Sequence, residues 1–168
     1  FDPGDGAQGA VSAVAVLAED KLIIAGDFTS YDGTACGRIA RLNPDGSLDP
    51  GFDAGVGADG PIDSIAVQAD GKVIVVGDFT SFGGIARGRI ARVDADGSLD
   101  LSFNPGVGAN APVSCVALQA DGKVLVGGDF TGYDGTLHDR VVRLNSDGSL
   151  DATFDPGTGA NDLVSCLL

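Results

Sequence analysis

A segment that returns at a fixed spacing of 51 residues limits what this chain can fold into more than any other feature. Residues 72–82 read Lys-Val-Ile-Val-Val-Gly-Asp-Phe-Thr-Ser-Phe, and nearly the same letters fill residues 21–31 and 123–133. Within this segment the letters Gly-Asp-Phe-Thr are identical in all three copies. Self-similarity of this period is typical of chains that stack similar units, so that each unit covers the apolar face of its neighbour.

The repeat also divides the chain into units. Its phase marker is a phenylalanine followed by Asp or Asn, which occurs at Phe1, Phe52, Phe103 and Phe154. We therefore predict one repeat array over residues 1–168, with units at about 1–51, 52–102 and 103–153 and a partial fourth unit at 154–168. A chain of 168 residues lies within the range of one domain and can bury a sizeable core.

Each unit is expected to contain four short strands, which are described here for the second unit. Its apolar run from Val73 to Val76 is rich in β-branched residues and indicates a strand covered on both faces. Asp-Gly pairs before and after this run indicate tight turns. The four expected strands are residues 62–68, 73–76, 89–93 and 98–103.

Four strands in each 51-residue unit predict an all-β fold, a β-propeller-type array of four-stranded antiparallel repeats. Three such units also suit a threefold β-trefoil or β-prism, which stays open as the alternative. The 27 glycines, with no Met or Trp, fit many tight turns rather than helices. In the first unit Asp20 stands where the other units have a turn glycine, so this unit departs from the repeat pattern at that hairpin.

The partial fourth unit repeats only the opening of the others and ends in a first-strand pattern from Val164. A strand without its second strand would expose a row of backbone groups that can pair with another chain. We therefore expect further repeats or other copies of the same chain as partners. The first residue is Phe rather than Met, which fits a piece of a longer protein.

The charge balance excludes several partners. The net charge is −14 with ten Lys and Arg, so a basic groove for nucleic acid is not expected. No apolar run approaches the roughly twenty residues of a membrane-spanning helix, so we expect no membrane insertion. Of the three cysteines, Cys115 and Cys166 share the repeat phase of Ser64 and are interpreted as small core residues rather than half-cystines.

The repeated letters also carry a family likeness. Residues 67–77 (Val-Gln-Ala-Asp-Gly-Lys-Val-Ile-Val-Val-Gly), residues 89–100 and Ser102-Phe103 resemble the delta-60 repeat, a β-propeller-like repeat of large, mostly bacterial, secreted or surface proteins. The resemblance covers the whole chain. It implies a propeller-like architecture and an extracellular or cell-surface location in a bacterium. It implies no activity, because the family has no general assigned one.

Repetition also argues against an active site, because a catalytic residue is expected to be singular. All ten aromatic residues and nine of the ten basic residues fall at repeated phases, and only Arg87 stands apart. We therefore predict no enzyme, no catalytic residue and no bound cofactor. The expected function is a structural or adhesive scaffold of an extracellular bacterial surface or secreted protein, acting through repeat stacking and self-assembly, as a ring or a filament.

The alternative function is a carbohydrate-binding module. One aromatic residue per unit precedes a glycine-containing loop, and a row of such rings on one face could stack on a glycan. The candidate residues are Tyr31, Phe82 and Tyr133.

The acidic side chains suggest two further hypotheses. Asp78, at the end of an apolar strand, is expected to form a buried ion pair with Arg89 or Arg92, with equivalents in the other units. Turns with the pattern [DN]-x-D-G-x-x-D resemble the start of a calcium loop, although the Glu that completes an EF-hand is missing. The calcium candidates are Asp45, Asp49, Asp94, Asp96, Asp100, Asp147 and Asp151.

Overall fold

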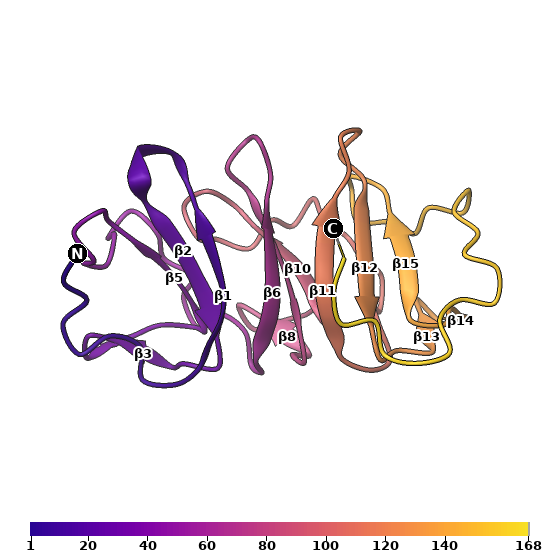
Figure 1. Cartoon of the computed structure of the whole chain (residues 1–168), viewed down its shortest axis with the longest axis horizontal. Coiled ribbons are helices and arrows are strands. Elements are labelled where there is room, and N and C mark those ends of the chain that lie inside the picture. Colours follow the sequence, from indigo (N-terminus) through magenta and orange to yellow (C-terminus); the bar gives the residue numbers. More distant parts are fainter. Residues whose placement is uncertain (168) are drawn as a thin grey trace.

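The structure, a computed structural model, describes residues 1–167 and is all-β. Three antiparallel sheets of three strands stand side by side along the long axis of the molecule, in the order of the sequence (Figure 1). The strands are β1 (Val11–Val16), β2 (Leu22–Gly26) and β5 (Ile39–Leu42) in the first unit, β6 (Ile62–Val67), β7 (Val73–Gly77) and β10 (Ile90–Val93) in the second, and β11 (Val113–Leu118), β12 (Val124–Gly128) and β15 (Val141–Leu144) in the third.

The second expected strand of each unit is the central strand of its sheet. In the second unit β7 pairs with β6 on one side and with β10 on the other, and every residue of β7 is buried. Neighbouring residues of β7 point to different units, because side chains alternate along a strand. Val73 and Val75 pack in one core cluster with Ile23 of the first unit, whereas Ile74 and Val76 pack in another with Val126 of the third.

Two of the three apolar core clusters lie between units, and the third, with Ile24 and Phe28, lies within the first unit. The two clusters between units each draw residues from two adjacent units, and the first strands β1, β6 and β11 lie next to one another. No barrel closes within residues 1–167, so the structure does not support the trefoil or prism alternative.

The prediction of a fourth strand in each unit is wrong. In each unit it is a single β-bridge to the third strand, made by Leu48, Leu99 or Leu150. In the second unit the carboxylate of Asp100 accepts the backbone N–H of Ser102 at 2.8 Å and its hydroxyl at 2.6 Å. This side-chain turn bends the chain directly after the bridge and prevents a longer ladder.

The loop after the central strand instead forms a hairpin whose two strands have two residues each, and this hairpin was not predicted. The three hairpins are β3 (Ser30–Tyr31) with β4 (Thr34–Ala35), β8 (Ser81–Phe82) with β9 (Ile85–Ala86), and β13 (Gly132–Tyr133) with β14 (Thr136–Leu137). Glycines with positive φ in the turns, such as Gly84 (φ 77°), allow these tight connections.

Two local features differ among the units. The first hairpin turns through a short 3₁₀ segment, η1 (Ala18–Asp20), in which Glu19 and Asp20 adopt φ values of 58° and 56°. The other two units have Gly71 and Gly122 at the position of Asp20 in this turn. Residues 163–167 form no strand, which corrects the expected fourth first strand, and Leu168 lies outside the described residues.

Candidate functional site

The junction between successive units is organised by one arginine on the third strand. Nε of Arg92 donates to Oδ2 of Asp100 at 2.7 Å, and its guanidinium lies 4.9 Å from the centre of the Phe103 ring. Nη1 of Arg92 donates to the carbonyl oxygen of Ser146 in the third unit at 2.6 Å. The side chain thus joins its own unit, the phase-marker phenylalanine and the following unit through charge-assisted and cation–π contacts.

The same contacts occur one repeat earlier. Arg41 donates to Asp49 at 2.8 Å, lies 5.4 Å from the ring of Phe52 and donates to the carbonyl of Ala95 at 2.6 Å. In the third unit Arg143 pairs with Asp151 at 2.7 Å and lies 4.9 Å from Phe154. Within residues 1–167, Arg143 makes no hydrogen bond to a following unit.

A lysine directly before the central strand completes each cluster. Nζ of Lys72 donates to Oδ2 of Asp100 at 2.7 Å, and Lys21 and Lys123 do the same to Asp49 and Asp151. Burial raises the pKa of Asp100, but the hydrogen bonds from Lys72, Ser102 and Arg92 outweigh it and hold the pKa well below its usual range. For Asp49 the hydrogen bond from Lys21 is the main cause that lowers the pKa to about 2.

The carboxylates proposed as calcium ligands are already engaged by other groups. Asp49, Asp100 and Asp151 are buried and already paired with two cations each. Asp94 pairs with Lys72, and Asp45, Asp96 and Asp147 each accept the backbone N–H and hydroxyl of the serine two residues later. In the described part of the chain, no group of three or more His, Cys, Asp or Glu side chains is arranged to hold a metal ion.

A second arginine in each unit binds the linker that leads to the next unit. Arg38, Arg89 and Arg140 adopt positive φ values of 64°, 68° and 68°, and Nη1 of each donates to a linker carbonyl, that of Ala58, Ala109 or Ala160. A left-handed backbone costs a non-glycine residue about 1–2 kcal/mol. These contacts hold the conformation in place in all three units.

The predicted ion pair of Asp78 is therefore correct in partner and wrong in burial. Its Oδ1 lies 3.3 Å from Nε of Arg89, but its side chain is 52% exposed. Asp78 follows the end of β7 and points outward. The buried ion pair of the unit is instead that of Arg92 with Asp100. The repeated phases of Arg92, Asp100 and Phe103 were a signal from which this buried cluster could have been predicted.

The structure contradicts the hypothesis that three aromatic residues form a row for glycan stacking. Tyr31, Phe82 and Tyr133 are buried, because the linker at the start of each unit covers them and pairs with them through Ala7, Ala58 and Ala109. The hydroxyl of Tyr31 donates to the carbonyl of Gly46 at 2.9 Å. A ring enclosed in this way presents no face to a sugar.

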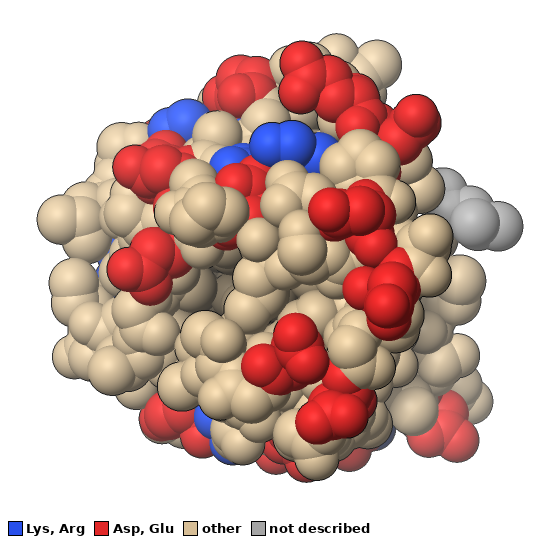
Figure 2. Space-filling model, turned by 90° about the vertical axis from the view of Figure 1, so that its left-hand side faces the viewer, with Lys and Arg blue, Asp and Glu red and all other residues tan. Residues whose placement is uncertain are grey.

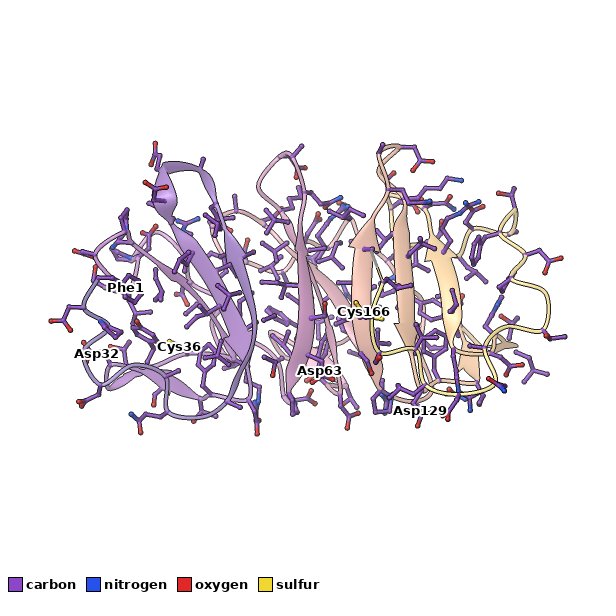
Figure 3. The ribbon with its side chains drawn as sticks, in the orientation of Figure 1. Phe1, Asp32, Cys36, Asp63, Asp129 and Cys166 are labelled. Atoms are coloured by element: carbon purple, nitrogen blue, oxygen red, sulfur yellow. The ribbon has the colours of Figure 1, made fainter. Side chains whose placement is uncertain are left out.

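The cysteines are free thiols in different surroundings. Cys115 is buried, and burial raises the pKa of its thiol to about 11, so it fits the predicted role of a small core residue. Cys166 is exposed, contrary to that prediction, because the segment that contains it forms no strand (Figure 3).

One hollow between the first and second units offers no singular polar cluster. A cavity of about 400 Å³ lies between the first and second units, with Cys36, Phe52 and two acids in its lining. Asp49 is held in the ion pairs described above, and Asp53 accepts the backbone N–H of Gly55 at 2.8 Å. No helix in residues 1–167 is long and apolar enough to cross a membrane.

The first unit leaves apolar side chains exposed on the face that the other units bury. Val14 and Val16 of β1 are 59% and 72% exposed, whereas their equivalents Ile65 and Val67 in β6 pack against the core between units. Phe1 is 72% exposed and lies at the same end of the array (Figure 3). Figure 2 views this end and shows that uncharged atoms cover much of it between the acidic side chains.

Comparison with known proteins agrees with this architecture. A family model described as "Domain of unknown function (DUF5122) beta-propeller" matches residues 19–52, 68–103 and 119–154. The chain is also similar to the crystal structure of a protein of unknown function from Bacteroides caccae, with a TM-score of 0.52 and 13% sequence identity. That similarity covers 82% of this chain and 46% of the other chain, so this chain spans less than half of its length. No curated protein matches the sequence.

Proposed function

Because the chain belongs to the DUF5122 β-propeller family, whose model matches more than half of it, we propose that it is a non-enzymatic scaffold that acts through the stacking and self-assembly of its repeat units. We further propose that this family corresponds to the delta-60 repeat that the sequence resembles. The proposed location, an extracellular or cell-surface setting in a bacterium, depends on that resemblance. The proposed partners are further repeats or other copies of the same chain.

The observation that supports this proposal is the duplicated junction. The contacts that join the first unit to the second also join the second to the third, through Arg41 and Arg92. The outer face of the first unit carries Val14 and Val16 at the phases that are covered inside the array. A contact of this kind between the end of one copy and the start of another is heterologous, and it closes into a ring or grows into a filament.

The repeated phases support the non-enzymatic part of the proposal. The charged side chains of the array form ion pairs and turns that recur in every unit, as at Asp49, Asp100 and Asp151. A scaffold needs such recurrent contacts, whereas a catalytic group is expected at one phase only. The sequence and the junction together favour assembly over chemistry.

Native mass spectrometry and sedimentation over a range of concentrations test the proposal. We expect particles heavier than the 16.7 kDa chain at high concentration, with association strengthened by salt because each copy carries a net charge of −14. Val16→Asp is expected to reduce association, because it places a charge on the exposed end face. Val56→Asp is the matched control, since Val56 is equally exposed, at 76%, but lies in a linker. A 16.7 kDa particle at every concentration would refute self-assembly.

A further inference from the structure

We propose that a second copy docks its first unit against the third unit of this chain, and that residues 154–160 of one copy then replace residues 1–7 of the other. The inference rests on the proposed self-assembly and specifies how it occurs. The occupant of the end face is thus a second copy of the chain, and the joining element is a segment that both copies contain.

The two segments are nearly identical. Residues 1–7 read Phe-Asp-Pro-Gly-Asp-Gly-Ala, and residues 154–160 read Phe-Asp-Pro-Gly-Thr-Gly-Ala, so they differ only at Asp5 and Thr158. Both occupy the same phase of the 51-residue repeat. Two copies joined with the geometry of the internal junctions would bring both segments to the same place, where only one fits. Residues 161–167, which bond to the third unit through Val164 and share the repeat phase of residues 8–14, would then leave the face of that unit.

Residues 1–7 are held in place through their own backbone groups, and residues 154–160 have the same groups. The N–H of Asp2 donates to the carbonyl of Asp45 at 2.6 Å, and the N–H of Asp5 donates to Oδ1 of Asp32 at 3.1 Å. Ala7 forms a β-bridge with Tyr31. None of these contacts uses the side chain of Asp5, so Thr158 could take its place.

Residues 154–160 make one of the two kinds of backbone hydrogen bond by which an internal linker joins its neighbouring units. Residues 52–58 bond to the unit before them, through Ala58 N–H to Gly37 O at 3.2 Å, and to the unit after them, through Asp53 N–H to Asp96 O at 2.7 Å. The segment 154–160 keeps the first kind of bond, from Ala160 N–H to Asp139 O at 3.2 Å. Its second kind of bond has no acceptor within residues 1–167.

The acceptor for that second bond lies in the first unit, at the opposite end of the array. Phe1 and Asp32 mark the N-terminal end in Figure 3, and residues 154–160 form the loop at the other end in Figure 1. One copy cannot bring the two ends together in this arrangement, but two copies can. The same docking would give Arg143 the carbonyl of Pro44, which shares the repeat phase of the acceptors Ala95 and Ser146.

Three equivalent glycines provide a matched test. A Cβ at Gly4 would meet the carboxylate of Asp32, whereas a Cβ at Gly157 or Gly55 would meet nothing within 4 Å. All three have positive φ, of 60°, 66° and 59°, so Ala adds a similar backbone strain at each. In the proposed junction, however, Gly157 occupies the place of Gly4 and its Cβ would meet Asp32 of the second copy.

We expect opposite effects on association, measured by sedimentation of the 168-residue chain. Gly157→Ala should weaken association about tenfold, and Gly4→Ala should strengthen it about tenfold because residues 1–7 would leave their site more readily. Gly55→Ala should leave it unchanged. Urea unfolding of Gly55→Ala and Gly157→Ala at low concentration checks that both monomers are equally stable.

The outcomes separate this inference from the proposed function. Association of the wild-type chain that Gly157→Ala leaves unchanged, or that Gly4→Ala does not strengthen, would overturn the segment exchange and leave self-assembly standing. A wild-type chain and variants that all stay monomeric would overturn both.

Discussion

Arg92 and Asp100 form the most buried ion pair in the described part of the array, with Nε and Oδ2 2.7 Å apart and side chains that are 10% and 6% exposed. The pair closes the second unit and, through Ser146, contacts the third. A buried carboxylate that pairs with Arg92 and Lys72 at once is costly to remove, because the buried Arg92 then loses its carboxylate partner and Lys72 keeps only Asp94.

Asp100→Asn is therefore expected to reduce the free energy of unfolding by about 3 kcal/mol, measured by urea denaturation. Asp78→Asn removes an exposed partner of Arg89 and is expected to cost less than about 1 kcal/mol. Equal losses for the two variants would show that burial does not set the strength of these pairs.

Stability is expected to fall between about pH 4 and pH 2. Hydrogen bonds from Lys21 lower the pKa of Asp49 to about 2. Burial raises the pKa of Asp59, but bonds from Ser81 and Thr80 outweigh it and lower the pKa to about 2. Because the unfolded carboxyl titrates near about 3.9, the unfolded chain binds protons first as the pH falls. The contribution is complete above about pH 4 and is lost toward pH 2.

The urea midpoint as a function of pH measures this loss, and Asp49→Asn should flatten its slope in that window. An acid slope that is the same in wild type and in Asp49→Asn would contradict the assignment. Stability at neutral pH decreases in that variant, so the comparison uses slopes rather than absolute values.

Two equivalent tyrosines are expected to respond differently to loss of the hydroxyl. Tyr31→Phe removes the bond to the Gly46 carbonyl and should cost about 1 kcal/mol. The buried hydroxyl of Tyr133 has no hydrogen-bond partner among the described residues, so Tyr133→Phe should be neutral or stabilising. The second unit already has Phe82 at this place. Thermal melting of both variants checks the contrast, and a larger loss for Tyr133→Phe would contradict it.

Close approach of the backbone at the junctions predicts a position-dependent effect of added methyl groups. A Cβ at Gly88 would meet the backbone of Val107 and Gly108 in the next linker, whereas a Cβ at Gly84 would meet nothing within 4 Å. We expect Gly88→Ala to cost about 1–3 kcal/mol through overpacking. Gly84→Ala should cost only the strain of its positive φ, about 1 kcal/mol, in the same urea assay.

Calcium is expected to leave stability unchanged. The carboxylates of Asp49, Asp100 and Asp151 are engaged by Lys and Arg, and those of Asp45, Asp96 and Asp147 by serine. Melting temperatures in calcium chloride and in chelator should therefore agree. A higher melting temperature in calcium that Asp96→Asn abolishes would show a binding turn that these bonds conceal.

Repetition made much of the array predictable from the sequence. The apolar run of β7 and its copies marked the central strand, because a buried strand must be apolar on both faces. The repeated phases of the arginines narrowed the expected partner of Asp78 to Arg89 or Arg92, and the structure shows that it is Arg89. The prediction of a fourth strand was wrong because the length of that strand depends on a local side-chain turn at Asp100, which competes with the hydrogen bonds of the ladder.

The sequence by itself determined the repeat period and the order of the repeated segments, because these properties depend only on which residues follow one another. Tertiary structure alone decided which carboxylates are buried, that Phe82 faces a linker rather than solvent, and that Arg92 reaches the next unit. Burial and contacts between units depend on the distance between residues about 50 positions apart, and that distance exists only once neighbouring sheets have packed.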